Sequence, residues 1–315
     1  DRSSAASDVY KRQNLSAASF CTVTFPRQGY APPSTTVEST QNRSRRPAPA
    51  ATLELMSSKD SETTTSLNPS LNTRVAIVTG ASAGIGEATA KLLAADGWHV
   101  VVAARRAERL EQVVQEIAQE GGKATPLVLD VTDGASISNF TAAVAELTGS
   151  KVDLLVNNAG GARGLDPVLE ANLEDWRWMF EANVMGTLEV TRALFDQLQV
   201  AEAPQVINVV SVAGRGAYRG GAGYNAAKFG QTALTDVMRM EFAESGVRVC
   251  QVDPGRVATD FSLNRFKGDA ERAQEVYADK LNLQAEDIGE TIRWIANRPR
   301  HMDVESIMIR PLDQV

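Results

Sequence analysis

A tyrosine and a lysine four residues apart, with a serine thirteen residues upstream, are the residues of this chain best suited to chemistry. Tyr224 and Lys228 delimit the run Tyr-Asn-Ala-Ala-Lys, and Ser211 precedes it. Positions i and i+4 share a helix face, so the phenol and the ammonium can project into one site. A nearby positive charge favours the ionised phenol, and lowering its pKa by about 3 units requires roughly 4 kcal/mol. The pattern predicts a tyrosine acid/base catalyst, although Tyr-x-x-x-Lys also occurs on ordinary helices.

The composition argues against several other classes of function. The 315 residues carry a net charge of −7 and are 43% hydrophobic, so a full core is possible and a nucleic-acid partner is not expected. No run approaches the roughly 18 apolar residues of a membrane span, so no membrane partner is expected either. Cys21 and Cys250 are too few for a disulfide framework. His99 and His301 lie far apart in sequence, which argues against a metal site or a serine–histidine triad.

Residues 1–73 differ from the rest of the chain. They are rich in Ser, Thr, Pro, Ala and Arg and lack apolar periodicity, so we expect a disordered tail. An Arg-rich, Ser-rich and acid-poor segment is typical of an organelle transit peptide. However, the first methionine is Met56, and Met-Ser-Ser-Lys-Asp reads like an ordinary start. Residues 1–55 are therefore either upstream non-native sequence on a cytoplasmic protein or a transit peptide that directs the protein to an organelle.

From Arg74 onward, short β-branched runs alternate with longer amphipathic stretches, which is typical of βαβ units. This predicts an α/β fold, a single Rossmann-type doubly wound domain over residues 74–315 with a seven-stranded parallel sheet. The expected strands are 75–78, 100–103, 127–129, 154–156, 206–210, 247–252 and 307–309. The expected helices are near 85–96, 107–120, 134–148, 173–199, 223–245 and 285–297. Residues 173–199 carry an apolar residue at every third or fourth position, which predicts one long helix with a single apolar stripe.

A glycine-rich turn follows the first expected strand and opens the first helix. Such a turn lets a backbone approach a pyrophosphate, which is bound at the helix N-terminus. The residues concerned are Gly80, Ser82, Gly84, Ile85 and Gly86. After the second strand the chain has no carboxylate for an adenosine ribose; it continues instead into Arg105 and Arg106. Two guanidiniums suit a 2′-phosphate, so the sequence favours NADP over NAD, unless the pair is simply a solvated helix start.

These motifs together resemble those of the short-chain dehydrogenases/reductases in order and spacing. The matching residues are Thr79-Gly80-x3-Gly84-x-Gly86, Asn157-Asn158-Ala159-Gly160, Ser211, Tyr224-x3-Lys228 and Pro254-Gly255. The resemblance covers essentially all of residues 74–315. It implies an NADP-dependent enzyme that transfers a hydride between the nicotinamide and a carbonyl or alcohol, and that assembles as a homotetramer or homodimer.

The resemblance also implies a role for individual residues. Tyr224 would be the general acid/base, Lys228 would bind the nicotinamide ribose and lower the tyrosine pKa, and Ser211 would bind the substrate oxygen. Asn183, within the long helix, would hold a water that links Lys228 to solvent. The remaining cofactor contacts would be Asp130 and Val131 at the adenine, Asn157, Ala159 and Gly160 at the adenosine and ribose, and Pro254, Gly255, Val257 and Thr259 at the nicotinamide.

The C-terminal third carries a narrower resemblance. Residues 261–269 and 283–288 are similar to the NADP-dependent 3-hydroxy acid dehydrogenases, which include serine and allo-threonine dehydrogenases. A 3-hydroxy acid needs a cation for its carboxylate, and the candidates are Arg265, Lys267, Arg215 and Arg219. Two other interpretations stay open, a reductase of lipid-like or xenobiotic ketones and a non-catalytic NADP-sensing regulator. Intact Ser211, Tyr224, Lys228 and Asn183 favour an enzyme, because a sensor needs only the glycine-rich turn.

Overall fold

The computed structural model describes residues 73–314, and the tail predicted for residues 1–73 lies almost entirely outside the described residues. Within residues 73–314, parallel strands form a seven-stranded sheet in the order β3-β2-β1-β4-β5-β6-β7. The strands are β1 (Val75–Thr79), β2 (His99–Ala104), β3 (Lys123–Val128), β4 (Leu154–Asn157), β5 (Gln205–Val209), β6 (Arg248–Pro254) and β7 (Ser306–Ile309). The strand order reverses between β1 and β4, which confirms the predicted doubly wound sheet.

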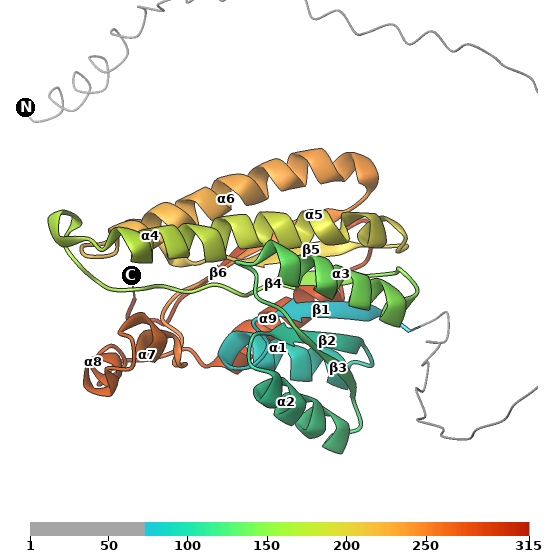
Figure 1. Ribbon diagram of the computed structural model, residues 1–315, viewed down its shortest axis with the longest axis horizontal. Coiled ribbons are helices and arrows are strands. Elements are labelled where there is room, and N and C mark those ends of the chain that lie inside the picture. The colour runs from blue at the N-terminus through green and yellow to red at the C-terminus, as the bar shows by residue number, and fades with distance from the viewer. Residues whose placement is uncertain (1–72, 315) are drawn as a thin grey trace, which may run out of the picture. The chain divides into compact units, whose positions relative to one another are not determined.

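Helices cover both faces of this sheet (Figure 1). The longer ones are α1 (Gly84–Ala95), α2 (Ala107–Gln119), α3 (Gly134–Thr148), α4 (Leu173–Phe180), α5 (Gly186–Gln199), α6 (Ala222–Phe242) and α9 (Ala285–Ala296). The shorter ones are α7 (Phe261–Arg265), α8 (Ala270–Glu275), and the turns η1 (Val168–Glu170), η2 (Glu181–Met185), η3 (Val212–Gly214) and η4 (Ala243–Ser245). Among residues 73–314, no helix has both the length and the apolar character that a bilayer crossing requires.

Successive residues of each central strand pack into opposite layers. In β1, Val75 and Ile77 join the core formed with α3, α5 and α6. Ala76 and Val78 join the core formed with α1, α2 and α9. Side chains alternate between the two faces of a strand, so a sheet covered on both sides needs apolar residues at every position. This explains why the central strands read as continuous apolar runs in the sequence.

Strand β3 is longer than predicted and begins earlier. The expected strand was 127–129, whereas the structure has Lys123–Val128, paired only with β2. β3 forms the edge of the sheet and is partly exposed, so it accommodates Lys123, Thr125 and Pro126. Proline is tolerated on an edge strand because its missing N–H need not bond to a neighbour. The bounds of β3 could therefore not be predicted from a run of apolar residues.

The segment predicted as one helix over 173–199 is α4, a π-helical turn η2 and α5 in direct succession. A π-helical turn inserts one extra residue, which rotates the following helix faces by about 100°. The predicted apolar stripe is accordingly interrupted, since Leu173 and Phe180 are exposed. Asn183 and Thr187 instead face the interior. The π-helical turn thus directs a polar residue of an amphipathic helix toward the centre of the protein.

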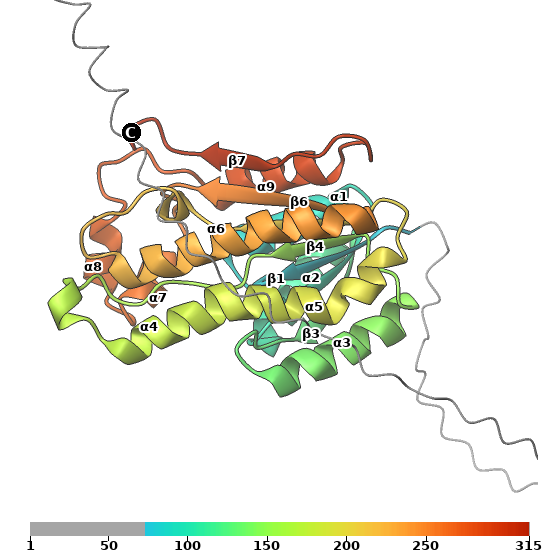
Figure 2. The same ribbon diagram turned by 90° about the horizontal axis from the view of Figure 1, so that it is seen from above.

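The short helices α7 and α8 lie at the carboxyl edge of the sheet. In Figure 2, strands β6 and β7 point toward these two helices. Ligands of open parallel sheets bind at this edge, where the strand order reverses. Residues 261–275, which contain α7 and α8, are called the lid below. The sequence did not predict these two helices, which are only five and six residues long.

Candidate active site

The glycine-rich turn between β1 and α1 is shaped for close backbone approach. Gly80 has φ +67°, a left-handed conformation that favours glycine. A Cβ on Gly86 would lie 2.5 Å from the carbonyl oxygen of Gly80, so only glycine fits there. Gly84 begins α1 and Ile85 follows, while the N-cap residue Ala83 has no side chain that could accept a hydrogen bond from the first turn. The amides at the start of α1 can therefore bind an anion.

Asn158 and Thr79 hold this turn against the end of β4. The Asn158 Nδ2 atom donates to the carbonyl oxygens of Thr79 at 2.9 Å and Gly80 at 3.3 Å. The Thr79 hydroxyl accepts hydrogen bonds from the backbone N–H groups of Asn158 and Ala159. Asn158 also lines the large cavity described below. Asn158 belongs to a motif of the family resemblance but was not predicted as a site residue.

The structure places the side chain of Asn157, a predicted cofactor contact, in the protein interior. Its side chain is buried, and Nδ2 donates to Thr191 Oγ1 and to Asn208 Oδ1, both at 2.9 Å. The two neighbouring asparagines point in opposite directions because successive residues at a strand end alternate between faces. The Asn157 side chain therefore links β4 to α5 and β5.

Arg106 lies beside the glycine-rich turn. Its Nη2 atom donates to Ser82 Oγ at 3.0 Å, which joins the end of β2 to the loop after β1. Arg105 and Arg106 are both exposed. An exposed guanidinium held next to this turn has the charge and the position to bind a phosphate on the adenosine ribose.

Asp130 and Val131 follow β3 at the same edge. Asp130 Oδ1 accepts hydrogen bonds from the backbone N–H and the hydroxyl of Thr132, so the carboxylate shapes its own turn. Val131 contacts Gly186 at the start of α5, where an added Cβ would lie 2.9 Å from Val131. Both residues are partly exposed at the side of the sheet where the adenine was expected.

Ser211, Tyr224 and Lys228 meet at the carboxyl end of β5. Ser211 is the N-cap of η3, and its Oγ accepts from the Ala213 N–H at 3.1 Å. Tyr224 and Lys228 lie one turn apart near the start of α6, and Lys228 Nζ is 5.8 Å from the Tyr224 ring centroid. The Ser211 side chain lies close enough to the Tyr224 phenol to lower its pKa. All three side chains are buried, and Tyr224 and Lys228 share one face of α6.

Burial and neighbouring charges shift the pKa values of Tyr224 and Lys228. Burial raises the pKa of Tyr224, an effect that Tyr218 reinforces, while the Ser211 side chain and Arg265 oppose it. Burial lowers the pKa of Lys228 to about 7, and the nearby Asp253 carboxylate opposes that shift. Both effects reflect the cost of placing a charge in a low-dielectric interior. Perturbed groups at one cavity are typical of acid/base catalysts.

A cavity of about 410 Å³ opens beside these residues at the carboxyl edge of the sheet. Its size is within the range of small-molecule and cofactor sites. The sequence-predicted residues on its wall are Ile85, Gly160, Ser211, Arg219, Tyr224, Lys228, Pro254, Gly255, Val257, Thr259 and Arg265. Asn183 is buried behind the wall, where its Nδ2 donates to the carbonyl oxygens of Gly161 and Met179.

The four basic residues proposed as carboxylate anchors differ in position. Arg265 lies on the cavity wall, where Nε donates to the Gly164 carbonyl at 2.8 Å and Nη1 to the Tyr218 hydroxyl at 3.1 Å. Its Nη2 atom is buried and has no hydrogen-bond partner among the described residues. Arg219 also lines the cavity but is exposed.

The other two basic residues are bound elsewhere, which corrects the expectation for them. Arg215 Nε donates to Asp253 Oδ2 at 2.8 Å, so its guanidinium balances a buried carboxylate. Lys267 Nζ donates to Asp175 Oδ2 at 2.8 Å and ties the lid to α4. Neither Arg215 nor Lys267 lines the cavity. In residues 73–314, no group of three His, Cys, Asp or Glu side chains lies close enough together to bind a metal ion.

The chain is similar to known proteins in sequence and in fold. A family model for the short chain dehydrogenases matches residues 74–270. An uncharacterized oxidoreductase of Mycobacterium tuberculosis is 50% identical over 241 residues, which are 76% of this chain and 92% of the relative. An NADP-dependent 3-hydroxy acid dehydrogenase of Salmonella typhi is 35% identical over 241 residues, 76% and 96% of the two chains. A solved structure, the closed form of serine dehydrogenase complexed with NADP+, has a TM-score of 0.72 and 33% identity, covering 76% of this chain and 96% of that one.

The chain belongs to the short-chain dehydrogenase family. It is an NADP-dependent oxidoreductase that acts on CH–OH groups, as the sequence predicted. The residues present fit this cofactor. The amides at the start of α1 suit a pyrophosphate, Arg106 suits the phosphate that distinguishes NADP from NAD, and the cavity beside Tyr224 has room for the nicotinamide end.

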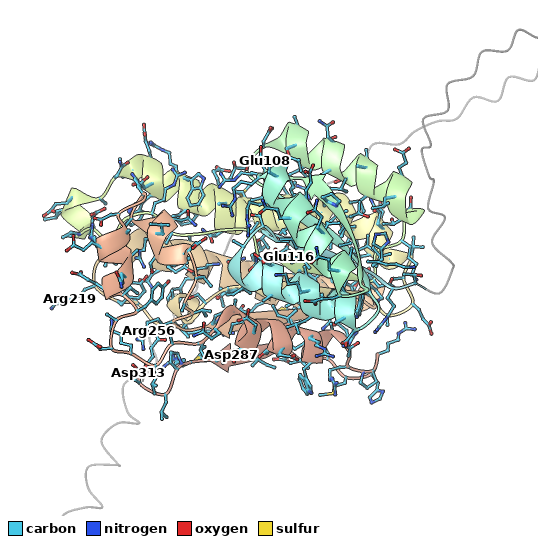
Figure 3. The ribbon with its side chains drawn as sticks, turned by 90° about the horizontal axis from the view of Figure 1, so that it is seen from below. Glu108, Glu116, Arg219, Arg256, Asp287 and Asp313 are labelled. Atoms are coloured by element: carbon cyan, nitrogen blue, oxygen red, sulfur yellow. The ribbon has the colours of Figure 1, made fainter. Side chains whose placement is uncertain are left out.

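The C-terminal residues of this dehydrogenase contribute to the site, which the sequence did not predict. Gln314 lies on the cavity wall, and its Oε1 accepts from the Arg256 backbone N–H at 2.7 Å. Asp313 forms an ion pair with the Arg256 guanidinium and accepts from the Leu281 N–H at 3.2 Å. Figure 3 shows Arg256 and Asp313 side by side, at the same end of the molecule as Arg219. These contacts join residues more than 30 positions apart, so no local pattern in the sequence predicts them.

Proposed function

We propose that this dehydrogenase interconverts a small 3-hydroxy acid and its 3-oxo acid, with Ser211, Tyr224 and Lys228 as the catalytic group and Arg265 as the carboxylate anchor. The relatives named for 3-hydroxy acids and serine support this substrate class, as does the resemblance of residues 261–269 and 283–288 to the 3-hydroxy acid dehydrogenases. A short acid also suits a cavity of about 410 Å³ that must hold the nicotinamide end as well.

The observation that carries this proposal is the buried, unpartnered Nη2 of Arg265. Two hydrogen bonds, to Gly164 and Tyr218, fix the guanidinium plane. A buried N–H donor without a partner is costly, so a ligand oxygen that accepts from Nη2 would be bound favourably once a small shift of the cavity wall exposes this atom. The guanidinium carbon lies 5.8 Å from the Tyr224 ring centroid, close enough for one short molecule to contact both residues. A carboxylate is the acceptor that a guanidinium prefers.

The proton would be handled by the protein's own side chains. In alcohol oxidation, Tyr224 would accept the hydroxyl proton of the substrate, and in carbonyl reduction it would return the proton to the same oxygen. The Ser211 hydroxyl would donate a hydrogen bond to that oxygen as negative charge develops on it. NADP, when bound, supplies the hydride acceptor or donor for the carbon that bears the oxygen.

Two cations would make Tyr224 acidic enough for this role. Lys228 Nζ and the Arg265 guanidinium carbon each lie 5.8 Å from the phenol ring centroid. At an effective dielectric constant near 20, a unit charge about 6 Å away contributes about 3 kcal/mol. Lowering a phenol pKa by about 3 units takes roughly 4 kcal/mol, and burial adds to that requirement. Neither cation is sufficient alone, so both are expected to stabilise the phenolate.

The cofactor contacts are assigned by the same reasoning. Arg106, with Arg105 beside it, would bind the 2′-phosphate, and the α1 amides would bind the pyrophosphate. Lys228 would contact the nicotinamide ribose. The remaining proposed contacts are Asp130 and Val131 at the adenine, Ala159 and Gly160 at the adenosine ribose, and Pro254, Gly255, Val257 and Thr259 at the nicotinamide.

A ketoreductase for neutral carbonyl compounds is the second candidate. The cavity wall includes the apolar side chains of Leu165, Phe261, Phe266 and Val276. Such a surface would accommodate a hydrophobic ketone without a carboxylate anchor. The two candidates therefore differ in what they require of Arg265.

A substrate panel with matched charged and neutral compounds distinguishes the two functions. We expect NADP-coupled turnover of L-serine, L-allo-threonine or 3-hydroxyisobutyrate, with a higher kcat/KM for the acid than for its methyl ester. Removing one partner of a desolvated charge pair costs about 2–5 kcal/mol, and Arg265 is only half-buried. Arg265→Met should therefore lower kcat/KM for the acid by roughly 30-fold or more. The loss of phenolate stabilisation by Arg265 would slow the acid and the ester alike. The readout is therefore the ratio of kcat/KM for the acid to kcat/KM for the ester, which should fall because only the acid also loses an ion pair.

Lys267→Met is the matched control, because Lys267 is two residues away and binds Asp175 instead of lining the cavity. This variant should change kcat/KM for the acid and for the ester by the same factor. A wild-type enzyme that prefers neutral aromatic ketones, together with an Arg265→Met variant that does not separate acid from ester, would establish the ketoreductase instead.

A further inference from the structure

Lys228 is hydrogen-bonded to a second buried side chain of its own helix, Gln231. The Nζ atom donates to Gln231 Oε1 at 2.8 Å and to the Val209 carbonyl at 3.2 Å. Gln231 is 1% exposed and Lys228 is 5% exposed. Lys228 and Gln231 are three positions apart, which places both on the inner face of α6. A carboxamide oxygen thus accepts a hydrogen bond directly from the lysine in a water-poor interior.

The orientation of this carboxamide is fixed from the other side. Gln231 Nε2 donates to Thr187 Oγ1 at 2.9 Å. The Thr187 hydroxyl in turn donates its single hydrogen to the carbonyl oxygen of Asn183 at 2.9 Å. Thr187 can therefore only accept a hydrogen bond from Gln231. The NH₂ group of Gln231 must face Thr187, so its oxygen must face Lys228.

We propose that Gln231 is a positioning residue that holds Lys228 as an oriented ammonium beside Tyr224. Gln231 and Val209 use two of the three ammonium hydrogens, which leaves the third for the ligand cavity that Lys228 lines. The inference rests on the proposed role of Lys228 in catalysis. It also revises the expectation for Asn183, since its carbonyl oxygen reaches Lys228 through the side chains of Thr187 and Gln231.

The need for such a residue follows from the charges around Lys228. Burial lowers its pKa to about 7, and Asp253 is the neighbouring anion that opposes the shift. Arg215 forms an ion pair with Asp253 and weakens its effect. Tyr224 lies beside Lys228, and the Arg265 guanidinium lies near the same phenol ring. A hydrogen bond to the charged form of a group favours that form. The Gln231 oxygen therefore stabilises the Lys228 ammonium in addition to Asp253, whose effect is weak.

The pH dependence of alcohol oxidation tests this role. Gln231→Leu removes the acceptor at similar volume, so Lys228 should lose its proton more easily and the Tyr224 phenolate should become less stable. We expect the acid limb of the kcat/KM profile to move to higher pH by about one to two pH units. Turnover at pH 7 should fall by about 10-fold or more, and the difference from wild type should narrow toward pH 10. Gln231→Glu keeps an acceptor for Nζ, so its acid limb should lie closer to that of wild type.

Thr235→Val is the matched control. The Thr235 hydroxyl accepts from Asn208 and donates to the Gln231 backbone carbonyl, within the same buried network but without contact to Lys228. This variant should lower Tm and leave the acid limb in place. A folded Gln231→Leu protein with a wild-type acid limb overturns the proposal, as does an equal shift in Thr235→Val. If the leucine variant does not fold, Gln231→Met carries the same expectation. Methionine is similar in volume to glutamine and has only a weak hydrogen-bond acceptor.

The two proposals fail in different ways. If Tyr224→Phe or Lys228→Met retains wild-type turnover, the catalytic assignment is wrong whatever Gln231 does. If both of those variants lose turnover while Gln231→Leu keeps the wild-type pH profile, only the positioning role is wrong.

Discussion

Replacing Arg106 by leucine should weaken the binding of NADP while leaving the binding of NAD nearly unchanged. Arg106 directly precedes α2, and its Nη2 atom is 3.0 Å from Ser82 Oγ in the glycine-rich turn. From this place the guanidinium can reach a phosphate on the adenosine ribose, a group that NAD lacks. Leucine retains part of the hydrophobic stem of arginine and removes the charge and its donors.

The size of the effect follows from the hydrogen bonds that are lost. Hydrogen bonds to a charged group contribute about 1.5–3 kcal/mol, and every 1.4 kcal/mol is a factor of ten in Kd. The Kd of NADPH should therefore rise by roughly 10- to 150-fold. Because Arg106 is exposed, solvent screening places the expected value toward the lower end. Fluorescence titrations with NADPH and NADH at one fixed ionic strength measure both constants directly.

Arg109 provides the control for this measurement. It lies three positions further along in α2, and its guanidinium is bound to Gln112 at 2.6 Å and to Glu87 at 3.4 Å. Arg109→Leu removes the same charge from the same helix, so it should leave the NADPH/NADH ratio of Kd values unchanged. If Arg106→Leu weakens both cofactors equally, or if Arg109→Leu alters the ratio as much, the assignment of Arg106 to the 2′-phosphate is refuted.

Two further predictions concern catalysis and assembly. Tyr224→Phe should lower turnover by at least about 10²-fold with little change in the Kd of NADPH, because it removes the proton carrier and keeps the ring; near-normal turnover would exclude the mechanism. We also expect a homodimer or homotetramer through α6, where Phe229, Val237 and Met240 are 44%, 47% and 72% exposed. Light scattering at micromolar concentration measures the mass, Val237→Glu should reduce it, and a wild-type monomer would contradict the expectation.

Local patterns in the sequence were sufficient for the fold class and for part of the site. The glycine-rich turn, the strands around it and the Tyr224–Lys228 pair each depend on residues within a few positions of one another. Strand alternation, helix periodicity and i,i+4 spacing are local geometry, so they can be read before folding is considered. The same reasoning failed for β3, because its position at the sheet edge, and not its own sequence, permits polar residues and a proline in the strand.

The direction of individual side chains was decided by tertiary contacts. Arg265 and Lys267 are equivalent in type and two residues apart, yet one is fixed on the cavity wall by Gly164 and the other is bound to Asp175. Their partners lie 101 and 92 positions away in the sequence. Nothing near the two residues specifies which long-range acceptor each will meet.

Gln231 is an intermediate case, because one of its contacts follows from local spacing and the other from tertiary packing. Its distance of three positions from Lys228 is a local fact that the sequence contains, and it could have indicated a contact on one helix face. The orientation of its carboxamide depends on Thr187, which is 44 positions away, and on the π-helical turn that presents the Asn183 carbonyl. The sequence determines which side chains can meet within one helix or strand. The packing of separate elements determines which hydrogen-bond donor pairs with which acceptor, because each buried polar atom needs a partner and that partner is often on another element.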